Sequence, residues 1–222
     1  MLYNNDDVLF WNQITIDHLN FIINEVNDEF KPKLINQLNY FESLKNMEQN
    51  EYYIYRNIKA HINFINTINE LNLDIQTYSI KHMIEEGFTF YRILLIINQN
   101  KVPIPIIENI KIQQILLPSS IEHINIMKKE ITNSRLLKKI IMHQKNLLKL
   151  EYRQHQEYIH YSQYGQVKEI FTLNDKIFHN GRLLVNLYEE IAKDHPTDIL
   201  NHIIKEEKYY LNLITRFKKS FI

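Results

Sequence analysis

The sequence predicts an all-α protein made of two tandem four-helix up-and-down bundles, and three observations carry this prediction. The chain of 222 residues contains only three glycines and five prolines, so few positions interrupt a helix. Apolar residues recur at three- and four-residue spacing along most segments. Two short motifs also recur, in the same order, in the two halves of the chain. We therefore expect an internal duplication with domains at residues 1–103 and 104–222.

The first half of the chain is predicted to form four helices. The first begins at Asp7, is capped by Asp6 or Asp7, and continues to about Val26. Asp28 and Pro32 mark the start of the second, because an acidic cap followed by proline in the first turn suits a helix N-terminus. The expected helices span residues 7–26, 31–48, 52–72 and 75–98. Their short connections predict an antiparallel bundle.

The second half is predicted to repeat this arrangement. Two prolines between residues 98 and 106 mark the boundary. Ser119 and Glu122, after Pro118, form a capping-box pattern that predicts the next helix start. The expected helices begin at residue 119 and span residues 134–163, 167–193 and 197–217.

Composition limits the classes of partner. Lys plus Arg and Asp plus Glu both number 26, so no net charge attracts nucleic acid or an anionic membrane. The chain has no cysteine, which excludes disulfides, thiolate metal sites and a cysteine nucleophile. No apolar run approaches membrane-spanning length, and residues 1–13 lack the pattern of a signal peptide. We expect a cytoplasmic protein without nucleic-acid or membrane partners; a homo-oligomer and a protein partner stay open.

The repeated motifs contain histidine and glutamate. IDHLNFI at residues 16–22 matches IEHINIM at residues 121–127, and HMIEEGFTFY at residues 82–91 matches HIIKEEKYYL at residues 202–211. The aligned pairs are His18 with His123, His82 with His202, and Glu86 with Glu206. One motif lies on the first expected helix of each half and the other on the fourth, and these two helices are neighbours in an up-and-down bundle.

This pattern predicts metal binding by the histidines and glutamates of the repeated motifs. His82 and Glu86 stand four residues apart, so both project from one helix face within reach of a single ion, and the second copy has the same spacing. His18 shares its helix face with Trp11 and Phe21, so it is expected to point into the bundle core. Imidazole, carboxylate and water ligands suit a divalent transition metal such as iron, manganese or zinc. The alternative is an ordinary His–Glu hydrogen bond.

The same segments carry a family resemblance. Phe10-Trp11, Asp17-His18 and Phe21-Ile22, together with the segment from His82 to Leu94, resemble the DUF2935 family, the tandem-repeat, ferritin-like helical proteins of Bacillus and its relatives. The resemblance spans nearly the whole chain. It implies a metal site without implying a reaction.

Two features depart from the family pattern. The resemblance implies a further histidine on the fourth helix, where this chain has Thr89 and Tyr209, and the second copy has Ile115-Leu116 in place of the Phe-Trp pair. These departures favour a rival function, a catalytically silent helical interaction protein that has lost its metal.

The remaining candidates are weaker. His61 and His179 occupy similar places on the third helices, whereas His143, His155, His160 and His195 are expected at the surface. Asp17 and Glu122 point away from the neighbouring histidines, and Glu25 and Glu130 are expected to face water. The tyrosines at 52, 53, 55, 158, 161 and 164 are expected to pack. No phosphate-binding loop, nucleophile elbow or His-Glu-x-x-His helix is present in the sequence.

The sequence therefore predicts a ferritin-like metal-binding protein whose ligands are His18, His82 and Glu86 in one copy and His123, His202 and Glu206 in the other. One site in each copy and one site shared by both copies fit the pattern equally. With iron or manganese, oxygen or peroxide chemistry would be available. Whether the protein is an enzyme stays open.

Overall fold

The computed structural model describes residues 3–74, 78–98, 134–164 and 168–219, together with residues 123, 125, 128 and 131. Every regular element among them is an α-helix, which confirms the predicted fold class for this part of the chain. The chain divides into two compact units, Tyr3–Ile104 and Pro105–Ile222. None of the described helices is long and apolar enough to cross a membrane.

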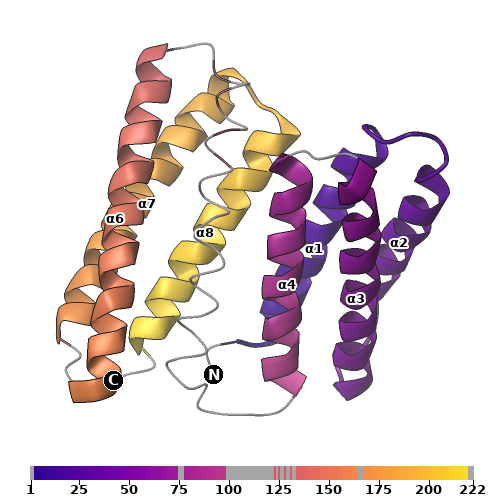
Figure 1. Cartoon of the computed structure of the whole chain (residues 1–222), viewed down its shortest axis with the longest axis horizontal. Coiled ribbons are helices and arrows are strands. Elements are labelled where there is room, and N and C mark those ends of the chain that lie inside the picture. The colour runs from indigo at the N-terminus through magenta and orange to yellow at the C-terminus, as the bar shows by residue number, and fades with distance from the viewer. Residues whose placement is uncertain are drawn as a thin grey trace. The chain divides into compact units, whose positions relative to one another are not determined.

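The first unit contains four helices arranged in a closed ring (Figure 1). They are α1 (Asn5–Ile23), α2 (Lys31–Leu44), α3 (Glu51–Asp74) and α4 (Tyr78–Asn98). Each helix packs against the next along the chain, and α4 packs against α1. The first and fourth helices are therefore neighbours, as an up-and-down bundle requires.

The start of α1 differs from the prediction that Asp6 or Asp7 caps it. Asn4 is the N-cap, and its side-chain oxygen accepts hydrogen bonds from the backbone N–H groups of Asp6 and Asp7. The Asp7 carboxylate accepts in return from the backbone N–H of Asn4, at 2.6 Å. These reciprocal bonds form a capping box, which satisfies donors that the first helical turn leaves unpaired.

The start of α2 also differs from the prediction. Phe30 is the N-cap and makes no side-chain capping bond, whereas Pro32 does occupy the first turn. Asp28 does not cap the helix; its carboxylate accepts a 2.8 Å hydrogen bond from the Lys31 ammonium. The fixed φ of proline thus starts the helix without a side-chain cap.

An aromatic core joins α1 to α4 and brings the two predicted ligand helices together. The rings of Trp11 and Phe90 stack with their centroids 5.8 Å apart, and both side chains are buried. Phe41 of α2 and Phe64 of α3 contact each other edge to face beneath them. Burial of such large rings stabilises the bundle and fixes how α1 lies against α4.

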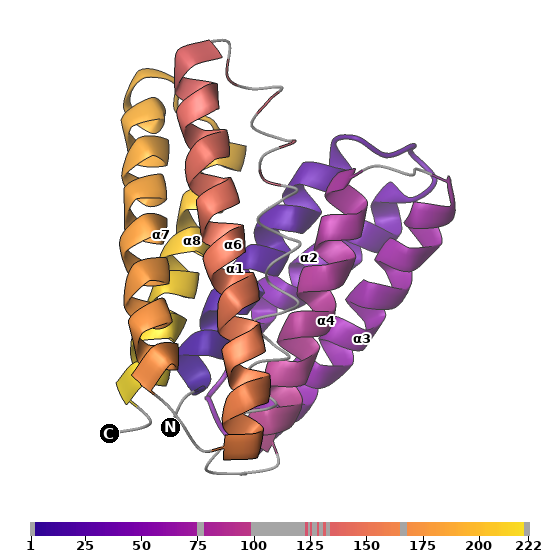
Figure 2. The ribbon, with the colours of Figure 1, turned by 60° about the vertical axis from the view of Figure 1, so that its left-hand side comes forward.

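The second unit contains α6 (Ser134–Tyr164), α7 (Lys168–Asp194) and α8 (Asp198–Lys219). Helix α7 packs against both α6 and α8 (Figure 2). The Thr197 hydroxyl accepts from the backbone N–H of Leu200 at 3.2 Å, which caps α8 where the sequence predicts its start. Most of the predicted first helix of this unit, including the capping box at Ser119, lies outside the described residues.

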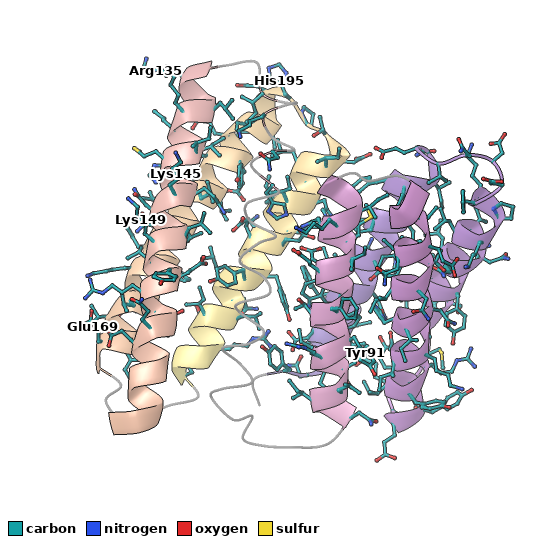
Figure 3. The ribbon with its side chains drawn as sticks, viewed as in Figure 1. Tyr91, Arg135, Lys145, Lys149, Glu169 and His195 are labelled. Carbon is teal, nitrogen blue, oxygen red and sulfur yellow. The ribbon has the colours of Figure 1, made fainter. Side chains whose placement is uncertain are left out.

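Apolar side chains from all three helices form the core of the second unit. Its buried members include Ile140, Leu147, Ile177, Leu184, Ile203 and Ile214. The opposite face of α6 is polar, and Arg135, Lys145 and Lys149 project from it into solvent (Figure 3). Each helix is therefore amphipathic, and its apolar face points into its own unit.

Candidate metal centre

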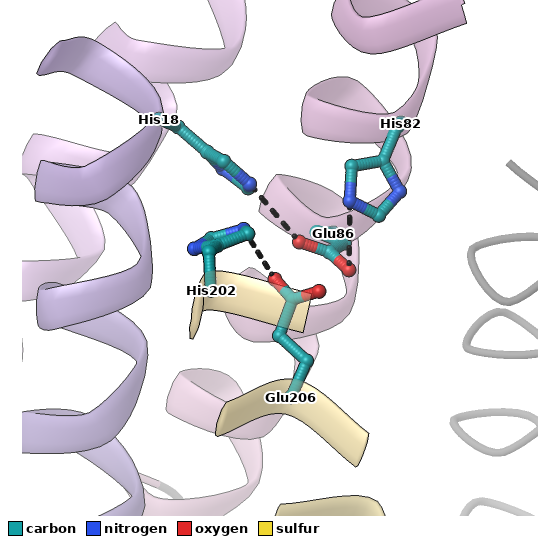
Figure 4. A group of neighbouring side chains, drawn as sticks. All are labelled: His18, His82, Glu86, His202 and Glu206. Atoms are coloured by element: carbon teal, nitrogen blue, oxygen red, sulfur yellow. Dashed lines mark ion pairs between the residues drawn. The ribbon is translucent and has the colours of Figure 1, made fainter. Parts of the chain in front are cut away.

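The predicted ligands of the first unit meet in its core. Glu86 lies between two imidazoles: its Oε2 is 3.4 Å from His18 Nε2, and its Oε1 is 3.4 Å from His82 Nε2 (Figure 4). One ligand atom from each of the three side chains lies within 4.8 Å of the other two. All three residues are at most 3% exposed. The expectation that His18 is buried beside Glu86 is confirmed.

Helix geometry explains this arrangement. His82 and Glu86 are one turn apart on α4, and His18 lies on the buried face of α1. Its neighbour Asp17 is only half-buried and accepts a hydrogen bond from Gln13 at 2.8 Å. Glu25 is exposed, as predicted. Of the adjacent residues Asp17 and His18, it is therefore His18 whose side chain contacts the Glu86 carboxylate.

The separations between Glu86 and its two imidazoles are longer than charge-assisted hydrogen bonds. A charge-assisted N–H···O bond is about 2.7–2.9 Å long, shorter than the 3.4 Å contacts of Glu86. With metal–ligand bonds of about 2.1 Å, two ligands at a tetrahedral angle are about 3.4 Å apart. Each of the two Glu86–imidazole contacts, taken alone, thus has the length of one edge of a tetrahedral coordination shell.

The second unit repeats this pattern of contacts. Glu206 lies with Oε2 at 2.8 Å from His123 Nε2 and with Oε1 at 2.8 Å from His202 Nε2, and Figure 4 shows the latter pair. Each carboxylate oxygen again meets a different imidazole. The three side chains are at most 8% exposed. The correspondence expected from the repeated motifs therefore extends to the contacting atoms.

The shorter contacts in the second unit are those of ion pairs. Burial alone would raise the pKa of Glu206, but the charges and hydrogen bonds of His202 and His123 hold this pKa well below its usual value. Burial would likewise lower the pKa of His123, yet hydrogen bonds and charges from Glu206 and Glu207 raise it to about 10. In the absence of metal, His123 is therefore a protonated imidazole that neutralises the buried carboxylate.

His61 is a core histidine and is excluded from the ligand set. Its Nδ1 is 3.0 Å from the carbonyl oxygen of Asn57, and its Nε2 is 3.1 Å from Thr15 Oγ1. Burial lowers the pKa of His61 to about 3, so the ring is neutral. The carbonyl can only accept, so Nδ1 carries the hydrogen. The unprotonated Nε2 faces Thr15 Oγ1, whose own hydrogen is donated to the Trp11 carbonyl at 2.9 Å. His179, its predicted counterpart, is exposed.

Two of the other predicted surface histidines, His143 and His195, can be placed. His195 is exposed (Figure 3), and His143 is half-buried. The side chains of His155 and His160 lie outside the described residues, as do Glu122, Glu130, Ile115 and Leu116.

The tyrosines divide between packing and surface stacking. Tyr53 is buried and its hydroxyl accepts a hydrogen bond from Asn12 at 3.2 Å, as expected for a packing residue. Tyr52 and Tyr55 are instead exposed and lie against the cations of Arg56 and Lys59. The side chains of the tyrosines at 158, 161 and 164 lie outside the described residues.

The positions where the family resemblance implies a further histidine supply no imidazole. Thr89 is fully buried, and its hydroxyl donates to the backbone carbonyl of Glu85 at 3.0 Å. Tyr209 lies under the Arg216 guanidinium, which is 5.9 Å from the ring centroid. Each carboxylate is therefore surrounded by two imidazoles from the repeated motifs.

A buried polar group beside the second cluster was not predicted from the sequence. Glu207 places Oε1 at 3.5 Å from His123 Nδ1. Nearby, the Tyr210 hydroxyl donates to the Glu151 carboxylate, and the Tyr188 hydroxyl is fully buried. The negative charge of Glu207 acts on both Glu151 and Tyr188 and raises their pKa values, in addition to the larger effect of burial. Glu207 and Tyr210 align with Gly87 and Phe90, and Glu151 and Tyr188 lie outside the motifs, so the repeat did not indicate these polar groups.

Comparison of the chain with protein-family models, curated proteins and solved structures gives no match. The buried histidines and glutamates therefore carry the functional assignment, and His18, His82, Glu86, His202 and Glu206 are the residues among them that could hold a metal ion.

Proposed function

We propose that this chain is a ferritin-like metal-binding protein in which each helical unit binds a divalent transition metal through two imidazoles and one carboxylate. The ligands are His18, His82 and Glu86 in the first unit. In the second unit they are His123, His202 and Glu206. The observation that carries the proposal is a buried glutamate, in each unit, whose two oxygens face two different buried imidazoles.

Burial makes this arrangement costly without a positive charge. A carboxylate in an apolar helical core loses its hydration, and a neutral imidazole returns only part of that free energy. A divalent cation would neutralise Glu86 and bind the nitrogen lone pairs of His18 and His82 at once. The 3.4 Å contacts of the first unit leave the spacing that such an ion needs. A bound ion with open positions would act as a Lewis acid.

The rival function, a helical interaction protein without metal, is supported by one observation in the second unit. There the 2.8 Å contacts of Glu206 are hydrogen-bond lengths, and a protonated His123 neutralises the carboxylate without an ion. The two proposals therefore differ in what compensates the buried charge, a metal ion or a proton.

Elemental analysis separates them. The test measures transition metal by mass spectrometry in protein purified without chelator, and compares the parent with the double variant Glu86→Gln and Glu206→Gln. Each substitution keeps the side-chain shape and removes the charge. We expect near-stoichiometric metal in the parent and none in the variant, with little change in the thermal midpoint of chelator-treated protein.

The matched control is the double variant Glu85→Gln and Glu189→Gln, which removes the same charge from residues that pair with Lys81 and Lys208. This control should retain its metal. Equal metal content in the parent and the Glu86/Glu206 variant, or metal in neither, would refute the ligand assignment and support the interaction protein.

A further inference from the structure

His123, the histidine that aligns with His18, contacts a second glutamate in addition to Glu206. In the second unit, His123 lies between two carboxylates from successive residues of α8, with Glu206 at 2.8 Å from Nε2 and Glu207 at 3.5 Å from Nδ1. Both ring nitrogens therefore face an acceptor. His123 and Glu207 are 2% and 3% exposed, so water does not screen this contact.

The first unit has no carboxylate at the position of Glu207. Because Glu86 aligns with Glu206, the residue that aligns with Glu207 is Gly87. A Cβ added to Gly87 would lie 3.0 Å from Ile65 Cγ1 and 3.5 Å from the Phe64 ring. The position is thus closed by apolar side chains of α3, and no side chain fits there without displacing them.

Stability alone does not account for Glu207. It is a buried carboxylate close enough to a second one, Glu151, to raise the pKa of that group by charge repulsion. Burying a carboxylate beside a second carboxyl group costs free energy that an apolar pair would not cost. A role that offsets this cost must use the contact that Glu207 makes with His123.

We propose that Glu207 is a positioning residue, which accepts the Nδ1 hydrogen of His123 and so directs the Nε2 lone pair of that ring toward the metal. This inference rests on the proposed metal-binding function. A carboxylate behind a ligating histidine fixes the tautomer and ring orientation and makes the imidazole a stronger donor. Loss of Glu207 should consequently weaken the binding of a divalent ion by the second ligand set.

The test uses Co²⁺ as the probe, because its visible absorption reports the ligand geometry, with affinity measured by competition against a chelator. The full-length Glu86→Gln protein serves as the background, which leaves the second ligand set complete. Adding Glu207→Gln should lower Co²⁺ affinity by about 10- to 100-fold and shift the absorption bands, which is the effect expected for losing such a partner.

Glu151→Gln in the same background is the matched control, because it replaces a nearby buried carboxyl group whose hydrogen bond is with Tyr210. It should change Co²⁺ affinity much less than Glu207→Gln and leave the absorption bands in place. Equal losses in the two variants, or no loss with Glu207→Gln, would overturn the inference while leaving the metal-binding function intact.

Two further measurements keep the result interpretable. Glu207→Asp retains the charge and shortens the side chain, so it should show an intermediate loss, and it replaces Glu207→Gln as the deciding variant if the latter does not fold. In a Glu206→Gln background, where only the first ligand set is complete, Glu207→Gln should leave Co²⁺ affinity unchanged; a loss there also overturns the inference. Failure of the parent to bind Co²⁺ refutes the proposed function instead.

Discussion

Tyr210 of α8 donates its hydroxyl hydrogen to Glu151 of α6 inside the core of the second unit. Burial is the main reason that the pKa of Glu151 rises to about 8, and the charge of Glu207 adds to the rise while the Tyr210 hydrogen bond opposes it. Glu151 is therefore protonated in the folded protein at a pH where the unfolded chain carries it as a carboxylate.

This raised pKa predicts a stability that falls as pH rises. Between the ordinary value of 4.5 and about 8, the folded protein holds more protons than the unfolded chain. Relative to Glu151→Gln, the parent should lose stability across this window by at most about 1.4 kcal/mol per pH unit. Hydrogen exchange of α6 amides in both proteins measures the difference. A difference in stability between the two proteins that stays constant from about pH 5 to about pH 8 would contradict the prediction.

Acid should destabilise the first unit through His61. Burial lowers the pKa of this ring from 6.5 to about 3, so below pH 6.5 the unfolded chain takes up a proton that the folded protein excludes. The contribution of the neutral His61 ring to the free energy of unfolding is fully present above pH 6.5. It should be lost as pH falls, by at most about 1.4 kcal/mol per pH unit relative to His61→Gln.

The single tryptophan of the chain makes this measurable, because Trp11 is buried in the first unit and its fluorescence reports unfolding there. His179→Gln, at an exposed position, is the control and should retain the acid sensitivity of the parent. If His61→Gln loses stability with acid as steeply as the parent does, another group is responsible.

The capping box at Asn4 predicts a local stability effect. Asn4→Ala removes the side-chain acceptor of two backbone N–H groups and should cost about 1 kcal/mol in the unfolding of the first unit. Asp6→Ala removes a first-turn charge but no cap, so it should cost less. Denaturant unfolding followed by Trp11 fluorescence compares the stabilities of the two variants. A larger loss of stability in Asp6→Ala than in Asn4→Ala would indicate that Asp6 is the cap.

Metal should stabilise the first unit if His18 is a ligand. A ligand that binds only the folded state, at 100 times its dissociation constant, adds about 2.7 kcal/mol to the free energy of unfolding. Zinc should therefore raise the unfolding midpoint reported by Trp11 in the parent and in Asp17→Asn, but not in His18→Gln. Equal shifts in all three proteins would show that zinc binds elsewhere.

The helices were predictable because their limits are set by local chemistry. The helices predicted at 134–163 and 167–193 span Ser134–Tyr164 and Lys168–Asp194 in the structure. Their limits were predictable because a glycine and a proline interrupt the apolar pattern nearby. Caps were harder to place. Several polar residues precede α1, and only the backbone path decides that Asn4, one turn before the apolar stripe, faces the free N–H groups.

The candidate site was predictable where the two halves of the sequence agree. The matching motifs identified both buried carboxylates and the imidazoles around them. Matching disregards positions at which the two copies differ, so it missed Glu207, which aligns with Gly87. Equivalent sequence positions also did not guarantee equivalent surroundings, as the buried His61 and the exposed His179 show. Both the role of Glu207 and the burial of His61 depend on side-chain contacts between helices that are distant in the sequence. The periodicity within one helix carries no information about such contacts.

The contact between His18 and Glu86 joins the first helix of its unit to the last. The separation is 86 − 18 = 68 positions, and α2 and α3 lie within the loop that the contact closes. An ion held by both residues would act on the chain as a reversible cross-link. A permanent cross-link over such a loop lowers the entropy of the unfolded chain by an amount worth on the order of 4 kcal/mol. Metal would therefore suppress partial opening of α1 away from α4, and so the first step of local unfolding or proteolysis in this unit.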